Sequence, residues 1–89
     1  MKKIGILNGE ISEVIAKMGH MDELVVCDAG LPIPEGPKRI DLALKKGLPG
    51  FLDTLDAVLQ EIEVQEVVIA QELAEKNSPI YQKICSLFS

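Results

Sequence analysis

The residues of this chain with the clearest potential for chemistry are a histidine and an aspartate eight residues apart, His20 and Asp28. His20 is the single histidine of the chain, and an imidazole can take and give protons near neutral pH. Asp28 follows an apolar run at residues 24–27 and opens a loop rich in glycine and proline. Ligands of open α/β sheets bind beyond the carboxyl ends of the strands. A carboxylate and a histidine there predict acid–base chemistry on a small molecule.

Each of these residues also has a purely structural interpretation, and the residues by themselves leave both open. His20 follows the end of an expected helix, where a side chain can bond the terminal carbonyls. Asp28 can close an Asx turn over Ala29 and Gly30. Solvated, capping or loop roles are expected for the remaining aspartates, Asp22, Asp41, Asp53 and Asp56.

The pattern of apolar residues predicts the elements that position these side chains. A helix is expected over residues 9–18, because Asn8 suits an N-cap, apolar residues recur at helical spacing and Gly19 suits a helix stop. A second helix is expected over 51–62, and a third begins with Ser78 as N-cap and Pro79 at the first helical position. Short apolar or alternating runs predict strands at 23–28, 39–44 and 66–70.

This order of elements predicts an α/β fold. We expect one domain over residues 1–89, an α/β sandwich with a mixed, largely parallel sheet flanked by helices. At 89 residues the chain buries a small share of its surface, and its hydrophobic content is 47%. Part of the apolar surface is therefore expected to form an interface.

Composition excludes several classes of function. The net charge of −5 and only three aromatic residues argue against nucleic-acid binding. No apolar run approaches the roughly 20 residues of a membrane span. Polar residues interrupt the apolar start of the chain at Asn8, Glu10 and Ser12, which argues against a signal peptide and predicts a cytoplasmic protein. Cys27 and Cys85 are expected to be buried, reduced thiols, and no motif for a nucleotide, a metal or a serine nucleophile is present.

Several segments of the sequence carry a family resemblance, namely residues 1–3, 5–8, 20–22, 28–34, 39–44, 47–49 and Phe51. They resemble the D-ribose pyranases, a family of ribose mutarotases. The similarity runs in register from residue 1 to about residue 72, and its motifs are long and ungapped. The related fucose mutarotases share the Gly-His pair and the aspartate but have a different loop at 29–34, which favours the ribose branch.

The resemblance implies an activity and roles for both candidate residues. The activity is interconversion of the pyranose and furanose forms of β-D-ribose, with His20 as proton donor, Asp28 as a ligand of sugar hydroxyls, and no metal or cofactor. It also implies a homo-oligomeric ring with sugar clefts between protomers. The predicted strand agrees, because six strand residues separate His20 from Asp28 by roughly 20 Å, too far for one ribose to touch both in one chain.

The chain also departs from the family pattern. Ribose pyranases continue beyond this length and contribute another histidine, a lysine and a Tyr-x-Asn motif, so the chain is expected to be C-terminally truncated relative to the family. The alternatives are a catalytically incompetent sugar-binding or structural homologue, or a mutarotase of fucose or another monosaccharide.

Overall fold

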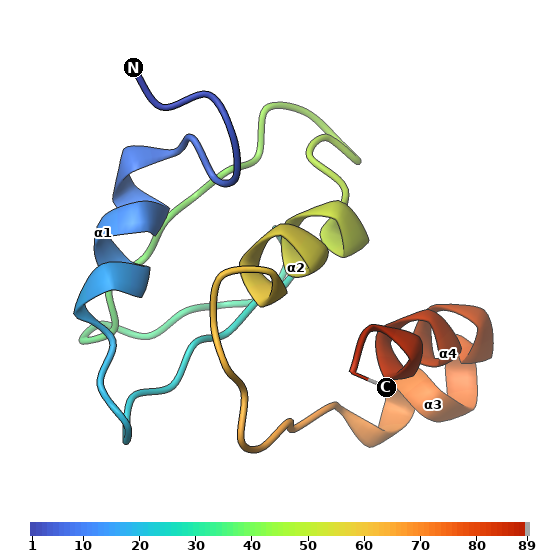
Figure 1. Cartoon of the computed structure of the whole chain (residues 1–89). Helices are drawn as coiled ribbons and strands as arrows, with labels where there is room; N and C mark the ends of the chain where they lie inside the picture. Colours follow the sequence, from blue (N-terminus) through green and yellow to red (C-terminus); the bar gives the residue numbers. More distant parts are fainter. Residues whose placement is uncertain (89) are drawn as a thin grey trace.

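The computed structural model describes residues 1–88, apart from the side chain of Glu72, and its regular structure there is helical (Figure 1). Figure 1 shows α1 at one side of the molecule, α2 in the middle, and α3 and α4 as a pair at the other side. Helix α4 packs against both α3 and α2. The helices of the described residues are α1 (Gly9–Lys17), α2 (Phe51–Leu59), α3 (Gln71–Lys76) and α4 (Ser78–Leu87).

The three expected helices are confirmed, with differences at their ends. Asn8 caps α1 as predicted, because its side chain accepts a hydrogen bond from the N–H of Ile11 at 2.9 Å. Helix α1 ends at Lys17, with Met18 in an extended conformation as its C-cap. Gly19 does not have the positive φ that a glycine stop requires. Helix α2 ends at Leu59, three residues earlier than predicted.

The C-terminal helix is capped one residue earlier than predicted. Asn77, not Ser78, accepts a side-chain hydrogen bond from the N–H of Ile80. Asn77 is also the C-cap of α3, so the two helices meet at this single residue. Helix α3 was not predicted, since its six residues are too few to show helical periodicity.

The predicted sheet is wrong. Residues 23–28, 39–44 and 66–70 carry no strand, and the β-bridge in the described part of the chain joins Lys45 to Leu48 within one turn. In that turn the N–H of Leu48 donates to Lys45 O at 3.0 Å, and Gly47 takes a φ of +79°, a conformation that favours glycine. The chain therefore is not an α/β sandwich over the residues described.

The physical reason is that an apolar run specifies a strand only if a partner completes its ladder of hydrogen bonds. In the described part of the chain, the backbone–backbone hydrogen bonds outside the helices belong to helix caps and short-range turns. Several apolar side chains of these segments consequently stay in solvent, as at Val25, Leu44 and Val68, which are 74%, 77% and 87% exposed, while others are half-buried.

Few apolar side chains are buried. Ile6, Val58 and Ile84 are the buried hydrophobic residues of the described chain. No helix within residues 1–88 has the length and apolar character needed to cross a membrane.

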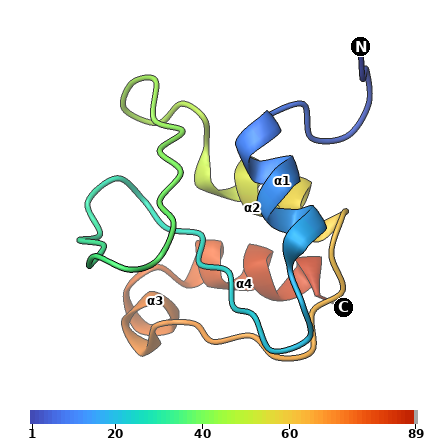
Figure 2. The same ribbon diagram turned by 90° about the vertical axis from the view of Figure 1, so that its left-hand side faces the viewer.

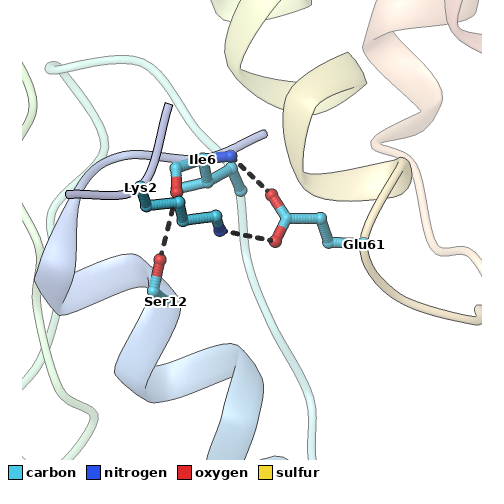
Figure 3. Close-up of polar contacts among 4 residues, drawn as sticks. All are labelled: Lys2, Ile6, Ser12 and Glu61. Atoms are coloured by element: carbon cyan, nitrogen blue, oxygen red, sulfur yellow. Dashed lines mark hydrogen bonds and ion pairs between the residues drawn. The ribbon is translucent and has the colours of Figure 1, made fainter. Parts of the chain in front are cut away.

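Polar contacts attach the N-terminal segment to the end of α2 (Figure 3). Glu61 Oε2 accepts a hydrogen bond from the N–H of Ile6 at 2.8 Å, and Glu61 Oε1 lies 3.7 Å from Lys2 Nζ. Ser12 of α1 donates from Oγ to Ile6 O at 3.4 Å. The backbone of Ile6 is thus held from two helical regions at once.

Candidate functional site

His20 lies on an exposed turn directly after α1. Asp22 closes this turn, since its Oδ2 accepts from the N–H of Gly19 at 2.7 Å and its own N–H donates to Gly19 O at 3.2 Å. This is the loop role expected of Asp22. The two bonds fix the backbone on both sides of His20, so the turn presents the imidazole to solvent.

The imidazole of His20 has one partner from a distant part of the chain. Gln65 Nε2 lies 3.3 Å from His20 Nδ1, and the two residues are 45 positions apart. Figures 1 and 2 show that the loop after α1 and the loop after α2 both pass below these helices. The amide of Gln65 therefore occupies one ring nitrogen and leaves Nε2 open to solvent on an exposed residue.

Asp28 lies in an Asx turn, which is one of the two roles that the sequence left open for it. Its Oδ1 accepts from the N–H of Gly30 at 3.0 Å, and its carbonyl accepts from the N–H of Leu31 at 3.4 Å. The residue is exposed. One carboxylate oxygen is thus used by the turn, and Oδ2 points to no hydrogen-bond partner within residues 1–88. The structural interpretation and the ligand interpretation of Asp28 are therefore compatible.

The structure gives His20 and Asp28 different polar partners. No hydrogen bond or ion pair joins them in the described residues, and each belongs to its own local turn. The separation of roughly 20 Å expected from strand geometry does not carry over, because residues 23–28 do not form the strand on which it was based.

The aspartates for which solvated, capping or loop roles were expected, Asp41, Asp53 and Asp56, have such roles in the structure. Asp41 Oδ1 accepts from the N–H of Ala43 at 2.9 Å, and its Oδ2 lies 3.6 Å from Arg39 Nη2. Asp56 Oδ2 accepts from Gln60 Nε2 at 3.1 Å on the surface of α2. Asp53 is exposed in the first turn of α2, where the helix dipole favours a negative charge.

An open, mainly apolar groove lies near the C-terminal end of the described chain, separate from these residues. Its volume is about 510 Å³, and it is lined mainly by apolar side chains of residues 67–88, among them Val67, Ile69 and Phe88. Tyr81 lies in it, and a hydrogen bond with the side chain of Cys85 raises the pKa of this tyrosine. Neither His20 nor Asp28 lines the groove, so it is not part of the predicted site.

The cysteines are not buried as the sequence predicted, since Cys27 is half-buried and Cys85 is exposed. Cys27 and Cys85 are both free thiols. Within the described residues no group of three or more histidine, cysteine, aspartate or glutamate side chains is arranged to hold a metal ion.

Sequence reasoning missed two residues that the structure places in polar contacts of interest, Gln65 and Glu61. Gln65 meets His20 and Glu61 meets Ile6 across 45 and 55 positions. No local spacing or motif signals contacts at such separations.

The family of the chain follows from its similarity to known proteins. Residues 1–89 match the model of a family described as the RbsD / FucU transport protein family, and the chain belongs to this family. Two of its relatives are named D-ribose pyranase. The one from Thermoanaerobacter sp. (strain X514) is 54% identical over 88 residues, which are 99% of this chain and 68% of the relative. The one from Clostridium tetani is 58% identical over 84 residues, 94% of this chain and 64% of the relative.

A solved structure is similar to this chain as well. It is that of Bacillus subtilis RbsD complexed with D-ribose, with a TM-score of 0.92, 43% sequence identity, and coverage of 99% of this chain and 67% of that chain. The chain thus spans about two thirds of the length of the relatives it matches.

Proposed function

We propose that this chain is a D-ribose pyranase, a sugar mutarotase that interconverts the pyranose and furanose forms of β-D-ribose. The observation that carries this function is the extent of the similarity. The chain matches D-ribose pyranases at 54% and 58% identity over nearly its whole length, and it matches the fold of a relative solved with D-ribose. The enzyme class is therefore isomerase, and the substrate is a free monosaccharide.

The reaction requires two proton transfers and no change in oxidation state. Ring opening delivers a proton to the ring oxygen, removes one from the anomeric hydroxyl and gives the free aldehyde. The aldehyde then recloses on a different hydroxyl, and the protons move in the reverse sense. Because this exchange is spontaneous in water, orientation and a proton carrier with a suitable pKa are enough to accelerate it.

His20 is the proposed proton donor. It is the only imidazole of the chain, and its turn exposes it to solvent, where a sugar can reach it. With Nδ1 bonded to Gln65, the nitrogen available to the ring oxygen is Nε2. The imidazolium form of the ring gives up its Nε2 proton when the sugar ring opens, and the neutral imidazole takes a proton back at Nε2 when a new sugar ring closes.

Asp28 is the proposed ligand of the sugar hydroxyls. A carboxylate accepts hydrogen bonds at both oxygens, and the Asx turn uses Oδ1 of Asp28 for one backbone bond. The turn holds the carboxylate in one orientation, and Oδ2 remains for a hydroxyl of ribose.

The complete site is proposed to lie between subunits of a homo-oligomeric ring, with His20 of one protomer beside Asp28 of its neighbour. Two observations support this arrangement. Within the described residues, no hydrogen bond or ion pair joins the turns that carry the two residues. In addition, large apolar side chains such as Met21 and Val25, which lie between them in the sequence, are 86% and 74% exposed, and an interface would bury them.

The proposed location of this activity is the cytoplasm. The two cysteines support it, because free thiols are typical of a reducing compartment.

Measurement of ring-form exchange tests the proposed function. NMR saturation transfer between the pyranose and furanose signals of D-ribose gives the exchange rate with and without the protein. We expect faster exchange of ribose, with a smaller acceleration for L-fucose. The measurement is made on this chain and on a version extended to the length of its relatives. If neither version accelerates ribose exchange, the proposal is contradicted. If L-fucose exchange is accelerated more than ribose exchange, the proposed substrate is wrong and the chain is a fucose mutarotase.

A further inference from the structure

The contact between Gln65 and His20 has a consequence for the chemistry of the imidazole. Each ring nitrogen of a histidine is a donor or an acceptor according to its proton, and the partner of one nitrogen decides which tautomer is present. The amide nitrogen of Gln65 lies 3.3 Å from Nδ1. An amide N–H₂ group only donates, so Nδ1 of a neutral imidazole in this contact is the acceptor. The hydrogen of the neutral ring is then on Nε2.

We propose that Gln65 is a positioning residue for His20, which holds Nδ1 through its side-chain amide and reserves Nε2 for proton exchange with the sugar. This role rests on the proposed ribose pyranase function. Gln65 acts through His20 and does not itself touch the substrate.

An amide suits this position because it bonds both protonation states of the ring. When the imidazole takes up a second proton, Nδ1 becomes a donor. A half-turn of the Gln65 amide then presents its carbonyl oxygen to Nδ1–H. From this imidazolium the proton on Nε2 leaves to the ring oxygen of the sugar, which gives a neutral ring with its remaining proton on Nδ1, and a proton from a sugar hydroxyl then returns to Nε2. Nδ1 keeps a partner through both transfers.

The placement of Gln65 also gives the ring an anchor that its own turn lacks. The bonds of the Gly19–Asp22 turn hold the backbone, while the side chain of His20 is exposed. A partner on Nδ1 fixes the rotation of the ring, as second partners of catalytic and metal-bound histidines do.

Nitrogen-15 NMR of the ring tests the proposal directly, since the chain contains one histidine and its signals need no assignment. In the neutral wild-type ring we expect the proton on Nε2 and an acceptor signal from Nδ1. Gln65→Leu removes the donor, so the nitrogen-15 chemical shift of Nδ1 is expected to move to the value of an unprotonated ring nitrogen without a hydrogen-bond donor. Gln65→Glu offers only acceptor oxygens, so the proton of the neutral ring is expected to move to Nδ1.

Gln60→Leu is the matched control. Gln60 is also an exposed glutamine with one side-chain partner, Asp56, and it makes no contact with His20. This variant is expected to leave both ring-nitrogen signals unchanged. Far-UV circular dichroism of each variant checks that the helices are retained.

Two results overturn the proposal. One is an unchanged pair of ring signals in both Gln65 variants, and the other is a neutral wild-type ring that carries its proton on Nδ1. In ribose exchange, loss of one such hydrogen bond is expected to lower the maximal rate roughly 2- to 10-fold with little change in the half-saturating ribose concentration. The ring signals do not depend on turnover. If the ring signals shift in the Gln65 variants but the protein does not accelerate ribose exchange, the proposed function is contradicted and the contact between Gln65 and His20 is supported. If the protein accelerates ribose exchange but the ring signals do not shift, the contact is contradicted and the proposed function is supported.

Discussion

The side chain of Glu61 holds the backbone of Ile6, with a 2.8 Å hydrogen bond from the N–H of Ile6 to Oε2 (Figure 3). Ile6 is 8% exposed, and the side chain of Glu61 is 27% exposed. A charged acceptor makes a stronger hydrogen bond than a neutral one, and partial burial limits competition from water. In a chain with so few buried hydrophobic residues, this bond has a large share in attaching residues 1–7 to the helices.

Replacement of Glu61 by alanine is therefore expected to destabilise the fold. The change leaves the nearly buried N–H of Ile6 without its acceptor, and such a loss costs about 1–3 kcal/mol in the free energy of unfolding. The measurement is a urea titration followed by circular dichroism.

Two variants serve as controls for Glu61→Ala. Glu63→Ala changes an exposed glutamate two positions further on and is expected to stay within about 0.5 kcal/mol of wild type. Lys2→Ala removes the exposed ion-pair partner of Glu61 and is expected to cost less than about 1 kcal/mol. If Glu61→Ala is no more destabilising than Glu63→Ala, the bond to Ile6 does not stabilise the fold.

Helices α1, α2 and α4 could be predicted from the sequence because the signals for a helix are local, whereas the six-residue α3 was missed. Asn8 and Pro79 act within one turn of their own positions, and the apolar stripe of α2 repeats within the helix itself. The differences are shifts of one to three residues at the ends, as at Asn77 and Leu59. These shifts do not change which helices form.

The sheet could not be predicted in the same way, because pairing is a property of two segments. The run at 66–70 has the composition of a buried strand, yet Val68 is 87% exposed and unpaired. The residues of the candidate site also differ in whether a local signal reveals them. His20 and Asp28 were found by residue type and local context, whereas Gln65 reaches His20 only through the fold.

Substitution of the histidine tests the proposed proton donor. His20→Ala is expected to abolish acceleration of ribose pyranose–furanose exchange, because no other imidazole in the chain can replace it. The helices should be unaffected, since His20 lies outside α1 on an exposed turn. Saturation-transfer NMR measures the exchange, and far-UV circular dichroism measures the helices. Full activity in a folded His20→Ala variant removes this residue from the mechanism.

The exposed apolar side chains predict self-association. Met21, Val25, Leu44 and Val68 are each more than 70% exposed, and burial of such a side chain contributes about 1.5–3 kcal/mol. We therefore expect the weight-average mass in sedimentation to rise with protein concentration. Val68→Lys and Val25→Lys should each reduce that mass if the residue lies in the interface, whereas Lys46→Glu, an exposed change of charge, should not. A monomer at all concentrations contradicts the proposed homo-oligomer.

Mixing of inactive subunits tests whether the site is shared. His20→Ala and Asp28→Asn each remove one member of the proposed pair, so each variant alone is expected to be inactive. If His20 of one subunit acts with Asp28 of its neighbour, random assembly of an equal mixture leaves both residues intact in about a quarter of the sites. Exchange is then expected to recover to about a quarter of the wild-type rate, in a chain length that is active as wild type. If both residues act within one chain, every site stays defective and mixing restores nothing. Absence of recovery, with subunit mixing shown by mass spectrometry, would therefore falsify the shared site while leaving the roles of His20 and Asp28 intact.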